Sequence, residues 1–340
     1  MKIGVVGLGF MGSTHLKAIK NLSASSSTNV ELTAVSDPRQ ELLTGDLSSI
    51  QGNLGGPGET YDFSSIGRYT DWRDMLADPN VEAIDFCTPT FLHVENAVSA
   101  LKAGKHVLVE KPMAISAADA ETMLAASRES GTTLMVAQVL RFLPSYRKLR
   151  DSILSGTVGN PLMATFRRRC GAPFWSAWMG DPTRSGGAII DLLIHDIDFV
   201  LHTFGEPDSI SAVGVDDLGR GLDVITANLG FSSGLNVVIQ GGWYHQKAFP
   251  FSMDYNVVCE GATFEFSSAG TEPTKYLEDG SHEALVLPEV DGYEAELAYF
   301  LECASTGKSP EFCPPEQSAA GVKLAEKLKE ARKRNGERIS

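Results

Sequence analysis

The chain opens with a short apolar run followed by three spaced glycines, and this combination constrains the fold more than any other feature. Residues 2–6 (KIGVV) are apolar and partly β-branched, as expected for a strand buried in a parallel sheet. Residues 7–12 read GLGFMG, a GxGxxG pattern, and a helix-forming stretch follows from Ser13. The pattern alone is common, but between a strand and a helix it is typical of the first turn of a dinucleotide-binding domain.

Each glycine has a physical task in such a turn. Gly7 permits the tight turn, Gly9 lets a pyrophosphate approach the backbone, and Gly12 lets helix and strand pack closely. Phe10 and Met11 complete the loop, and the helix N-terminus behind them favours negative charge. The sequence therefore predicts a cofactor loop formed by these five residues. A glycine-rich turn without a ligand is the alternative.

Asp37 follows the second predicted strand, residues 30–36. An acidic side chain at this position accepts hydrogen bonds from ribose hydroxyls and repels a 2′-phosphate, so it favours NAD over NADP. Arg39 leaves NADP possible, because a guanidinium can bind that phosphate. An Asp-Pro step that merely ends the strand is the alternative that involves no ligand.

Predicted strands and helices alternate as far as about residue 138. After a glycine- and serine-rich excursion, the predicted elements are a short helix, a strand, a helix and a strand, over residues 72–77, 81–87, 93–103 and 105–109. The excursion covers residues 44–68 and has no predicted role. Alternation of this kind predicts an α/β domain, a parallel sheet with helices on both faces.

Beyond residue 138, strands recur without regular intervening helices. The predicted strands are 162–170, 209–216, 223–231, 235–243 and 253–260, and the predicted helices are 188–204 and 316–334. This texture predicts an α+β domain with an open, largely antiparallel or mixed sheet. We therefore predict two domains, 1–138 and 139–340, in keeping with a length of 340 residues.

Lys111 is the first candidate for chemistry. Glu110, Lys111 and Pro112 directly follow the predicted strand KHVLV. Ligands of open parallel sheets bind beyond the carboxyl ends of the strands, so Lys111 is placed where the reactive end of a cofactor could lie. A buried lysine can polarise a hydroxyl or carbonyl oxygen. A surface lysine paired with Glu110 is the alternative.

Asp191 and His195 are the second candidates. They are four residues apart, so one continuous helix over 188–204 would place both on the same, otherwise apolar face. Histidine can take and return a proton near neutral pH, and Asp198 could orient it. A hydrogen-bonded core histidine is the alternative. No third ligand stands at a telling spacing, so we predict no metal site.

Charge and cysteine content narrow the range of partners. The chain has 29 Lys and Arg against 43 Asp and Glu, a net charge of −14, which argues against nucleic acids and anionic membranes as partners. The five cysteines are scattered and form no CxxC pair, as expected for free thiols in a reducing compartment. No apolar run is long enough to span a bilayer. We expect a soluble cytoplasmic protein.

Taken together, these residues resemble the Gfo/Idh/MocA family of glucose–fructose oxidoreductases and inositol dehydrogenases. The strings that carry the resemblance occur in family order and are GxGxxG, Ser36-Asp37-Pro38, Cys87-Thr88-Pro89-Thr90 to His93, GKHVLVEKP and GG-x3-DLLIHDID. Two features depart from the pattern. The excursion over 44–68 replaces a clean helix, and Ser185-Gly186-Gly187 stands where three glycines are usual.

The resemblance implies a Rossmann domain and a second domain whose open sheet often mediates assembly into a homodimer or homotetramer. It also implies NAD(P)-dependent oxidation or reduction of a sugar, cyclitol or nucleotide sugar at a CH–OH carbon. By position, Lys111 would contact the reacting oxygen and the nicotinamide ribose, His195 would be the acid/base, and Asp191 would position the substrate. The residues expected along the cofactor are Thr88, Pro89, His93 and Glu110, and those expected in the substrate pocket are Arg141 and Trp175.

Two other functions are compatible with the same fold. An NAD-dependent glycosidase would oxidise its substrate only transiently and release sugar without net NADH. A noncatalytic NAD-binding regulator would tend to lose the catalytic lysine or histidine, and this chain has both Lys111 and His195.

Overall fold

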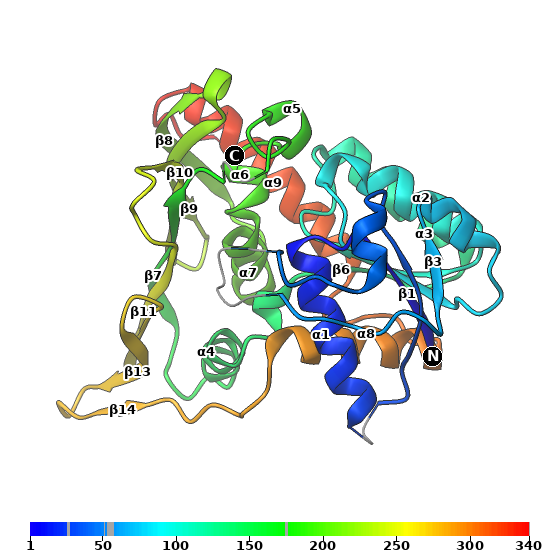
Figure 1. Cartoon of the computed structure of the whole chain (residues 1–340). Helices are drawn as coiled ribbons and strands as arrows, with labels where there is room; N and C mark the ends of the chain where they lie inside the picture. Colours follow the sequence, from blue (N-terminus) through cyan, green and yellow to red (C-terminus); the bar gives the residue numbers. More distant parts are fainter. Residues whose placement is uncertain (26–27, 51, 53–57, 174–175, 340) are drawn as a thin grey trace. The chain divides into compact units, whose positions relative to one another are not determined.

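The computed structural model describes residues 1–25, 28–50, 52, 58–173 and 176–339 (Figure 1). These residues form two compact units. The first contains Met1–Val139 and Asp291–Ala319, and the second contains Leu140–Val290 and Ala320–Ser340. The return of 291–319 to the first unit was not part of the prediction of two consecutive domains. No helix in the described ranges is long and apolar enough to cross a membrane.

The first unit is built on a six-stranded sheet. Its strands are β1 (Lys2–Val6), β2 (Glu31–Ser36), β3 (Gly67–Tyr69), β4 (Ala83–Phe86), β5 (His106–Glu110) and β6 (Leu134–Ala137). They run in the order β3-β2-β1-β4-β5-β6, and every pair is parallel. This order confirms the predicted doubly wound sheet. The strand order reverses between β1 and β4, which is where such sheets bind ligands.

Helices cover this sheet. They are α1 (Phe10–Ala24), α2 (His93–Lys102), α3 (Ala117–Ser130) and α8 (Gly292–Thr306), with short 3-10 turns η1 (Gln40–Thr44), η2 (Trp72–Ala77) and η3 (Thr90–Leu92). Helices α2 and α3 lie side by side (Figure 1). Helix α8 packs against α1, where Asn21 Nδ2 donates to Glu294 Oε1 at 2.6 Å. This packing explains why residues 291–319 belong to the first unit.

The described part of the excursion over 44–68 contains buried apolar side chains. Leu47 and Phe63 are fully buried, and residues Asp46 and Thr60 form an isolated antiparallel bridge. At its end, β3 begins at Gly67 and pairs with β2. This strand was not predicted, because three residues, GRY, are too few to show alternation.

The second unit is built on an eight-stranded sheet. Its strands are β7 (Pro161–Gly171), β8 (Ser209–Asp217), β9 (Leu222–Gly230), β10 (Asn236–His245), β11 (Ser252–Cys259), β12 (Ala262–Ser267), β13 (Thr271–Leu277) and β14 (His282–Ala284). The order is β14-β13-β12-β11-β7-β10-β9-β8. Only the β7–β10 pair is parallel among these neighbours, so the predicted mixed, largely antiparallel sheet is confirmed.

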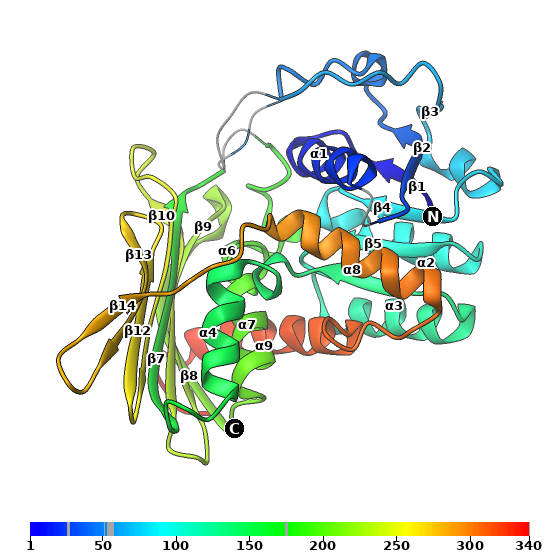
Figure 2. The ribbon, with the colours of Figure 1, turned by 90° about the horizontal axis from the view of Figure 1, so that it is seen from below.

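Helices lie along one face of this sheet (Figure 2). They are α4 (Pro144–Leu154), α5 (Pro182–Ser185), α6 (Ala188–Asp191), α7 (Ile194–Phe204) and the C-terminal α9 (Pro315–Lys333), with 3-10 turns η4 (Val139–Arg141) and η5 (Leu218–Arg220). Tyr146 of α4 packs edge-on against Phe199 of α7 and Tyr255 of β11, with ring centroids 5.0 and 5.3 Å apart. On the opposite face, the described residues place no helix.

The helix predicted over 188–204 is in fact two helices. The backbone amides of Leu192 and Leu193 both donate to the carbonyl of Ala188, at 2.9 Å each, so the regular ladder is interrupted between α6 and α7. The prediction of one continuous helix was wrong, because the apolar pattern continues across the break. Asp191 therefore ends one helix and His195 lies in the first turn of the next, and the four-residue spacing alone does not place them on one face.

Candidate active site

The glycine loop has the shape that its sequence predicts. Gly7 has a φ of +89°, in the left-handed region that favours glycine. A Cβ added at Gly12 would lie 1.9 Å from the Gly7 carbonyl oxygen, so helix α1 approaches β1 more closely than a side chain would allow. A Cβ at Gly9 would meet no atom within 4 Å. Open space beside Gly9, in front of the N-terminus of α1, is a cradle that fits a pyrophosphate.

Asp37 lies beside this loop and is almost fully buried. Its Oδ2 accepts the backbone N–H of Leu8 at 2.8 Å. Its Oδ1 accepts both the backbone N–H and Nε of Arg39 at 2.9 Å, and the Arg39 Nη2 donates to Oδ2 at 2.9 Å. The carboxylate thus lies at the carboxyl end of β2 with the arginine folded onto it. This is the place that the acidic ribose ligand of a dinucleotide site occupies.

His93 connects the segments that follow β4 and β5. Its Nδ1 lies 2.8 Å from the carbonyl oxygen of Pro112, and its Nε2 lies 2.8 Å from that of Thr88. Asn96 Nδ2 also donates to Thr88 Oγ1, at 2.9 Å. His93 itself is buried, and burial lowers its pKa. It shapes the edge on which Thr88 and Pro89 lie, and its own contact with a cofactor stays a prediction.

Lys111 begins directly after β5. Its backbone N–H donates to Glu110 Oε2 at 2.9 Å, and its peptide bond to Pro112 is cis. Glu110 is buried, with only 5% of its surface exposed. Thr88, Pro89, Glu110 and Lys111 therefore lie at the carboxyl ends of two adjacent strands, on the edge of the sheet that also carries the glycine loop. The residues of this unit fit a dinucleotide.

In the second unit, Asp191 is buried at the end of α6 and His195 is half-buried in α7. The turn before α6 explains the departure from three glycines. Gly186 and Gly187 both have a φ of +80°, whereas Ser185 ends α5 and its Oγ accepts the backbone N–H of Gly187 at 3.1 Å. A serine therefore fits at 185, because only the two following positions require the left-handed conformation.

An ionic network holds α6 from the side. Asp223 Oδ1 accepts the backbone N–H of Ala188, the first residue of α6, at 2.9 Å. Arg332 of α9 lies with Nη1 3.5 Å from Asp223 Oδ2 and Nη2 2.5 Å from Asp216 Oδ2. Lys329 Nζ donates to the Gly186 carbonyl at 3.0 Å. Burial raises the pKa of Asp223, although the Ala188 amide and Arg332 oppose that effect.

Two further ion pairs anchor α7. Arg141 is 1% exposed and donates twice to Asp198, from Nε at 2.8 Å and from Nη2 at 2.7 Å. Arg168 of β7 donates from Nε to Asp196 Oδ2 at 2.8 Å. Asp198, considered above as an orienter of His195, is thus a partner of Arg141. These pairs join residues 57 and 28 positions apart, so no local sequence pattern predicts them.

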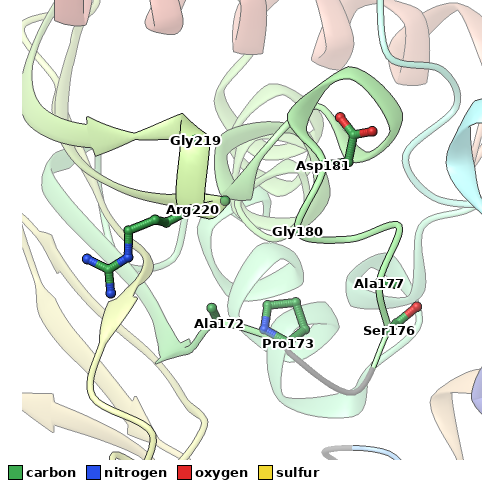
Figure 3. Close-up of a pocket in the computed structure, with 9 residues that line it drawn as sticks. Ala172, Pro173, Ser176, Ala177, Gly180, Asp181, Gly219 and Arg220 are labelled. Atoms are coloured by element: carbon green, nitrogen blue, oxygen red, sulfur yellow. The ribbon is translucent and has the colours of Figure 1, made fainter.

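A cavity of about 290 Å³ lies in the second unit between the segment after β7 and the turn η5 (Figure 3). It is lined by Ala172, Pro173, Ser176, Ala177, Gly180, Asp181, Gly219, Arg220 and Gly221. Asp181 caps α5, since its Oδ1 accepts the N–H and the hydroxyl of Thr183. The predicted pocket residue Trp175 falls outside the described residues. The lining of this cavity includes neither Asp191 nor His195.

Comparison with known proteins covers both units. Residues 1–138 match the model of an oxidoreductase family with an NAD-binding Rossmann fold, and residues 146–265 match the GFO/IDH/MocA C-terminal domain. The chain is 28% identical to a myo-inositol 2-dehydrogenase of Thermotoga maritima over 325 residues, 91% of this chain and 90% of that protein. It is 37% identical to a 1,5-anhydro-D-fructose reductase of Ensifer adhaerens over 145 residues, 41% of this chain and 44% of that protein.

Solved structures share the whole fold. A levoglucosan dehydrogenase in complex with NADH and levoglucosan superposes with a TM-score of 0.84 at 18% identity, over 100% of this chain and 98% of that chain. A probable dehydrogenase from Thermotoga maritima gives a TM-score of 0.79 at 24% identity, over the same shares of the two chains. At these identities the likeness concerns the fold alone.

Proposed function

This chain belongs to the Gfo/Idh/MocA oxidoreductase family with an NAD-binding Rossmann domain, and from this premise we propose that it interconverts a secondary alcohol and a ketone on a sugar or cyclitol, with NAD as the hydride carrier. A nucleotide sugar is a third substrate class within the proposal. The relative that matches over 91% of the chain is named an inositol dehydrogenase, which supports the cyclitol class.

The observation that carries the proposal is the place of Lys111. It follows β5 directly, its backbone is held by the buried Glu110, and it shares the carboxyl edge of the sheet with the glycine loop. The chemistry that bound NAD supplies is acceptance or release of a hydride. In this proposal the Lys111 ammonium donates a hydrogen bond to the reacting oxygen, which stabilises the negative charge that develops there.

We assign the proton transfer to His195. In this proposal His195 takes the hydroxyl proton during oxidation and returns it during reduction, as an imidazole can near neutral pH. Asp191 positions the substrate and supports His195. Arg141 fixes α7 through its ion pair with Asp198. Direct contact of Arg141 or Trp175 with substrate stays a prediction.

We further propose that the enzyme prefers NAD to NADP. The Asp37 carboxylate lies at the ribose position, and Arg39 is bonded to it in the structure rather than extended toward a phosphate. Asp37 would repel a 2′-phosphate, and Arg39 would have to leave this pair to bind one.

We also propose that the protein assembles into a homodimer or homotetramer. Met163 of β7 and Val213 and Val215 of β8 are 49%, 43% and 59% exposed. They stand an odd number of positions from the buried Ala164 and Ala212 of the same strands, so their side chains point to the opposite face of the sheet. Exposed apolar side chains on a sheet face favour a second protein surface as their partner. A cytoplasmic location also belongs to the proposal, supported by five free cysteines, of which four are buried.

The test is a panel of cyclitols, aldoses and nucleotide sugars incubated with NAD, scored by absorbance of the reduced nicotinamide. The proposal expects one NADH per molecule of substrate oxidised. Release of free sugar without net NADH would instead identify a glycosidase. Tight NAD binding with no turnover across the panel and in the reverse direction would identify a regulator. Either of these results would contradict the proposed function.

A further inference from the structure

His15 lies in α1 and is completely buried. Its Nδ1 is 2.8 Å from Asp85 Oδ2, and its Nε2 is 3.2 Å from Glu110 Oε1. Asp85 belongs to β4 and Glu110 ends β5, so one imidazole lies between carboxylates from two adjacent parallel strands. His15 stands three residues after Gly12, on the helix that the glycine loop opens, and is not among the predicted site residues.

Glu110 has a separate partner for each of its oxygens. Oε1 faces His15, and Oε2 accepts the backbone N–H of Lys111 at 2.9 Å. A buried carboxylate requires paired charge or hydrogen bonds, because leaving it without them costs several kcal/mol. A chain of contacts therefore runs from α1 through His15 and Glu110 to the backbone of Lys111.

We propose that His15 is a positioning residue for the reaction: it fixes Glu110 from behind, and thereby holds Lys111 in place at the carboxyl end of β5. The inference rests on the proposed function, because it assigns to His15 a role in turnover by way of Lys111. The inference goes beyond the proposed function because it assigns a role in turnover to a fully buried residue behind the site, His15, that acts only through Glu110 and Lys111.

The groups on the strand side set the charge of His15. Burial lowers the pKa of His15, but the Asp85 carboxylate at 2.8 Å and the neighbouring Cys87 raise it, and together they hold the pKa well above its ordinary value. Burial raises the pKa of the Cys87 thiol, so that neighbour stays protonated. The raised pKa favours the imidazolium form of His15. Nδ1 then donates to Asp85, whereas Nε2 lies 3.2 Å from Glu110 Oε1 in an ion-pair contact without hydrogen-bond geometry.

The groups from α8 add no second cation. The Tyr293 ring lies 6.1 Å from the His15 ring, centroid to centroid, and Glu296 is buried further along the same helix. Burial, together with the charges of Glu110 and Glu296, raises the pKa of Tyr293, so this phenol stays neutral. His15 therefore contributes positive charge between the Asp85 and Glu110 carboxylates.

The same place has a second chemical interpretation, as a metal site. One ligand atom each from His15, Asp85 and Cys87 lies within 4.8 Å of the others. The direct 2.8 Å contact between His15 and Asp85 argues against it, since an ion would have to break that contact and deprotonate a thiol whose pKa is raised.

Two substitutions of His15 distinguish the contact of Nδ1 with Asp85 from the contact of Nε2 with Glu110. In His15→Gln the side-chain amide can reach the place of Nε2 and donate toward Glu110, whereas in His15→Asn it stands at the place of Nδ1 and donates toward Asp85. If His15 acts through Glu110, His15→Asn lowers kcat about tenfold or more while the NADH dissociation constant and the KM for substrate change little, and His15→Gln restores most of kcat. His282→Gln, at an exposed position, is the matched control.

A structural role alone predicts a different result. It would lower the melting temperature in both variants, and kcat per folded enzyme would stay at the wild-type level. That result, measured with the best substrate of the panel, would overturn the inference. A metal role would give a stoichiometric zinc content in the purified wild type and loss of turnover with a chelator, which would also overturn it.

A measurement on the wild-type protein tests the inference even if the His15 variants do not fold, because it does not depend on turnover. In histidine-labelled wild-type protein, a nitrogen NMR titration should show one imidazole that keeps protons on both nitrogens to a higher pH than an ordinary histidine, whose pKa is about 6.5. If no imidazole does so, the inference is overturned. The Lys111→Ala variant distinguishes failure of the proposed function from failure of the inference about His15. If the proposed function is wrong, Lys111→Ala keeps wild-type turnover. If Lys111→Ala is inactive and His15→Asn is fully active, the inference about His15 alone is wrong.

Discussion

The backbone N–H of Leu8 donates a 2.8 Å hydrogen bond to Oδ2 of Asp37, and this bond joins the glycine loop to the carboxyl end of β2. The same carboxylate binds Arg39. Asp37 therefore shapes the loop, and in the proposed function it also presents negative charge where a ribose would lie.

Substitution of Asp37 separates these tasks. Asp37→Asn keeps an acceptor for Leu8 but removes the charge, so it should relax the preference for NAD over NADP about tenfold while leaving the loop intact. Asp37→Ala also removes the acceptor and should weaken NAD binding further. The measurement is kcat/KM for both cofactors, with Arg39→Ala as the comparison. Unchanged cofactor kinetics in both Asp37 variants would remove Asp37 from the site.

Arg332 is expected to support catalysis from the C-terminal helix. Arg332→Ala leaves the buried Asp223 without its cation, which should lower the free energy of unfolding by about 3 kcal/mol and lower kcat by loosening the start of α6. Asp223→Asn in the same background keeps an acceptor for Ala188 and should recover most of the stability. Lys333→Ala, at an exposed cation of the same turn, is the control. Equal stability of Arg332→Ala and the control would contradict this account of the network.

The protonation of His15 predicts a pH dependence of stability. Because its folded pKa lies well above the ordinary value of 6.5, its contribution is complete below about pH 6.5 and is lost as pH rises through the folded pKa. The difference in unfolding free energy between wild type and His15→Gln should therefore shrink with rising pH. Denaturant titrations at several pH values measure it. A difference that grows with pH has the wrong sign for this account.

The features predicted from sequence are those that local chemistry determines. The GxGxxG loop, the parallel strands around it and the place of Lys111 follow from glycine spacing and from short apolar runs, which need no knowledge of distant residues. The mixed sheet was likewise visible in alternation and turn residues, as in the β9–β10 hairpin.

What the sequence did not show depends on contacts between distant segments. Arg141 and Asp198 are 57 positions apart, and Asp223 and Arg332 are 109 apart, so neither pair leaves a local pattern. The packing of α8 on α1 also depends on distant segments. So does the break between α6 and α7, because the apolar pattern of the sequence continues across it without interruption.

The uncovered sheet face leads to a prediction about assembly. Val215→Lys places a charge on that face and should convert a dimer or tetramer to smaller species, measured as molar mass by light scattering. Val286→Lys, at an exposed valine outside the strands, should leave the mass unchanged. A wild-type monomer, or a Val215→Lys variant with wild-type mass, would count against assembly through this face.

The central claim is that Lys111 and His195 perform the chemistry of an NAD-dependent dehydrogenase. Its most direct test is kcat for NADH formation by Lys111→Ala and His195→Asn, with the best polyol or sugar of the panel, alongside the NADH dissociation constant. The account predicts that kcat falls about a hundredfold or more in each variant, while NADH binding stays within a few-fold of the wild type. Near wild-type turnover in either variant would contradict it.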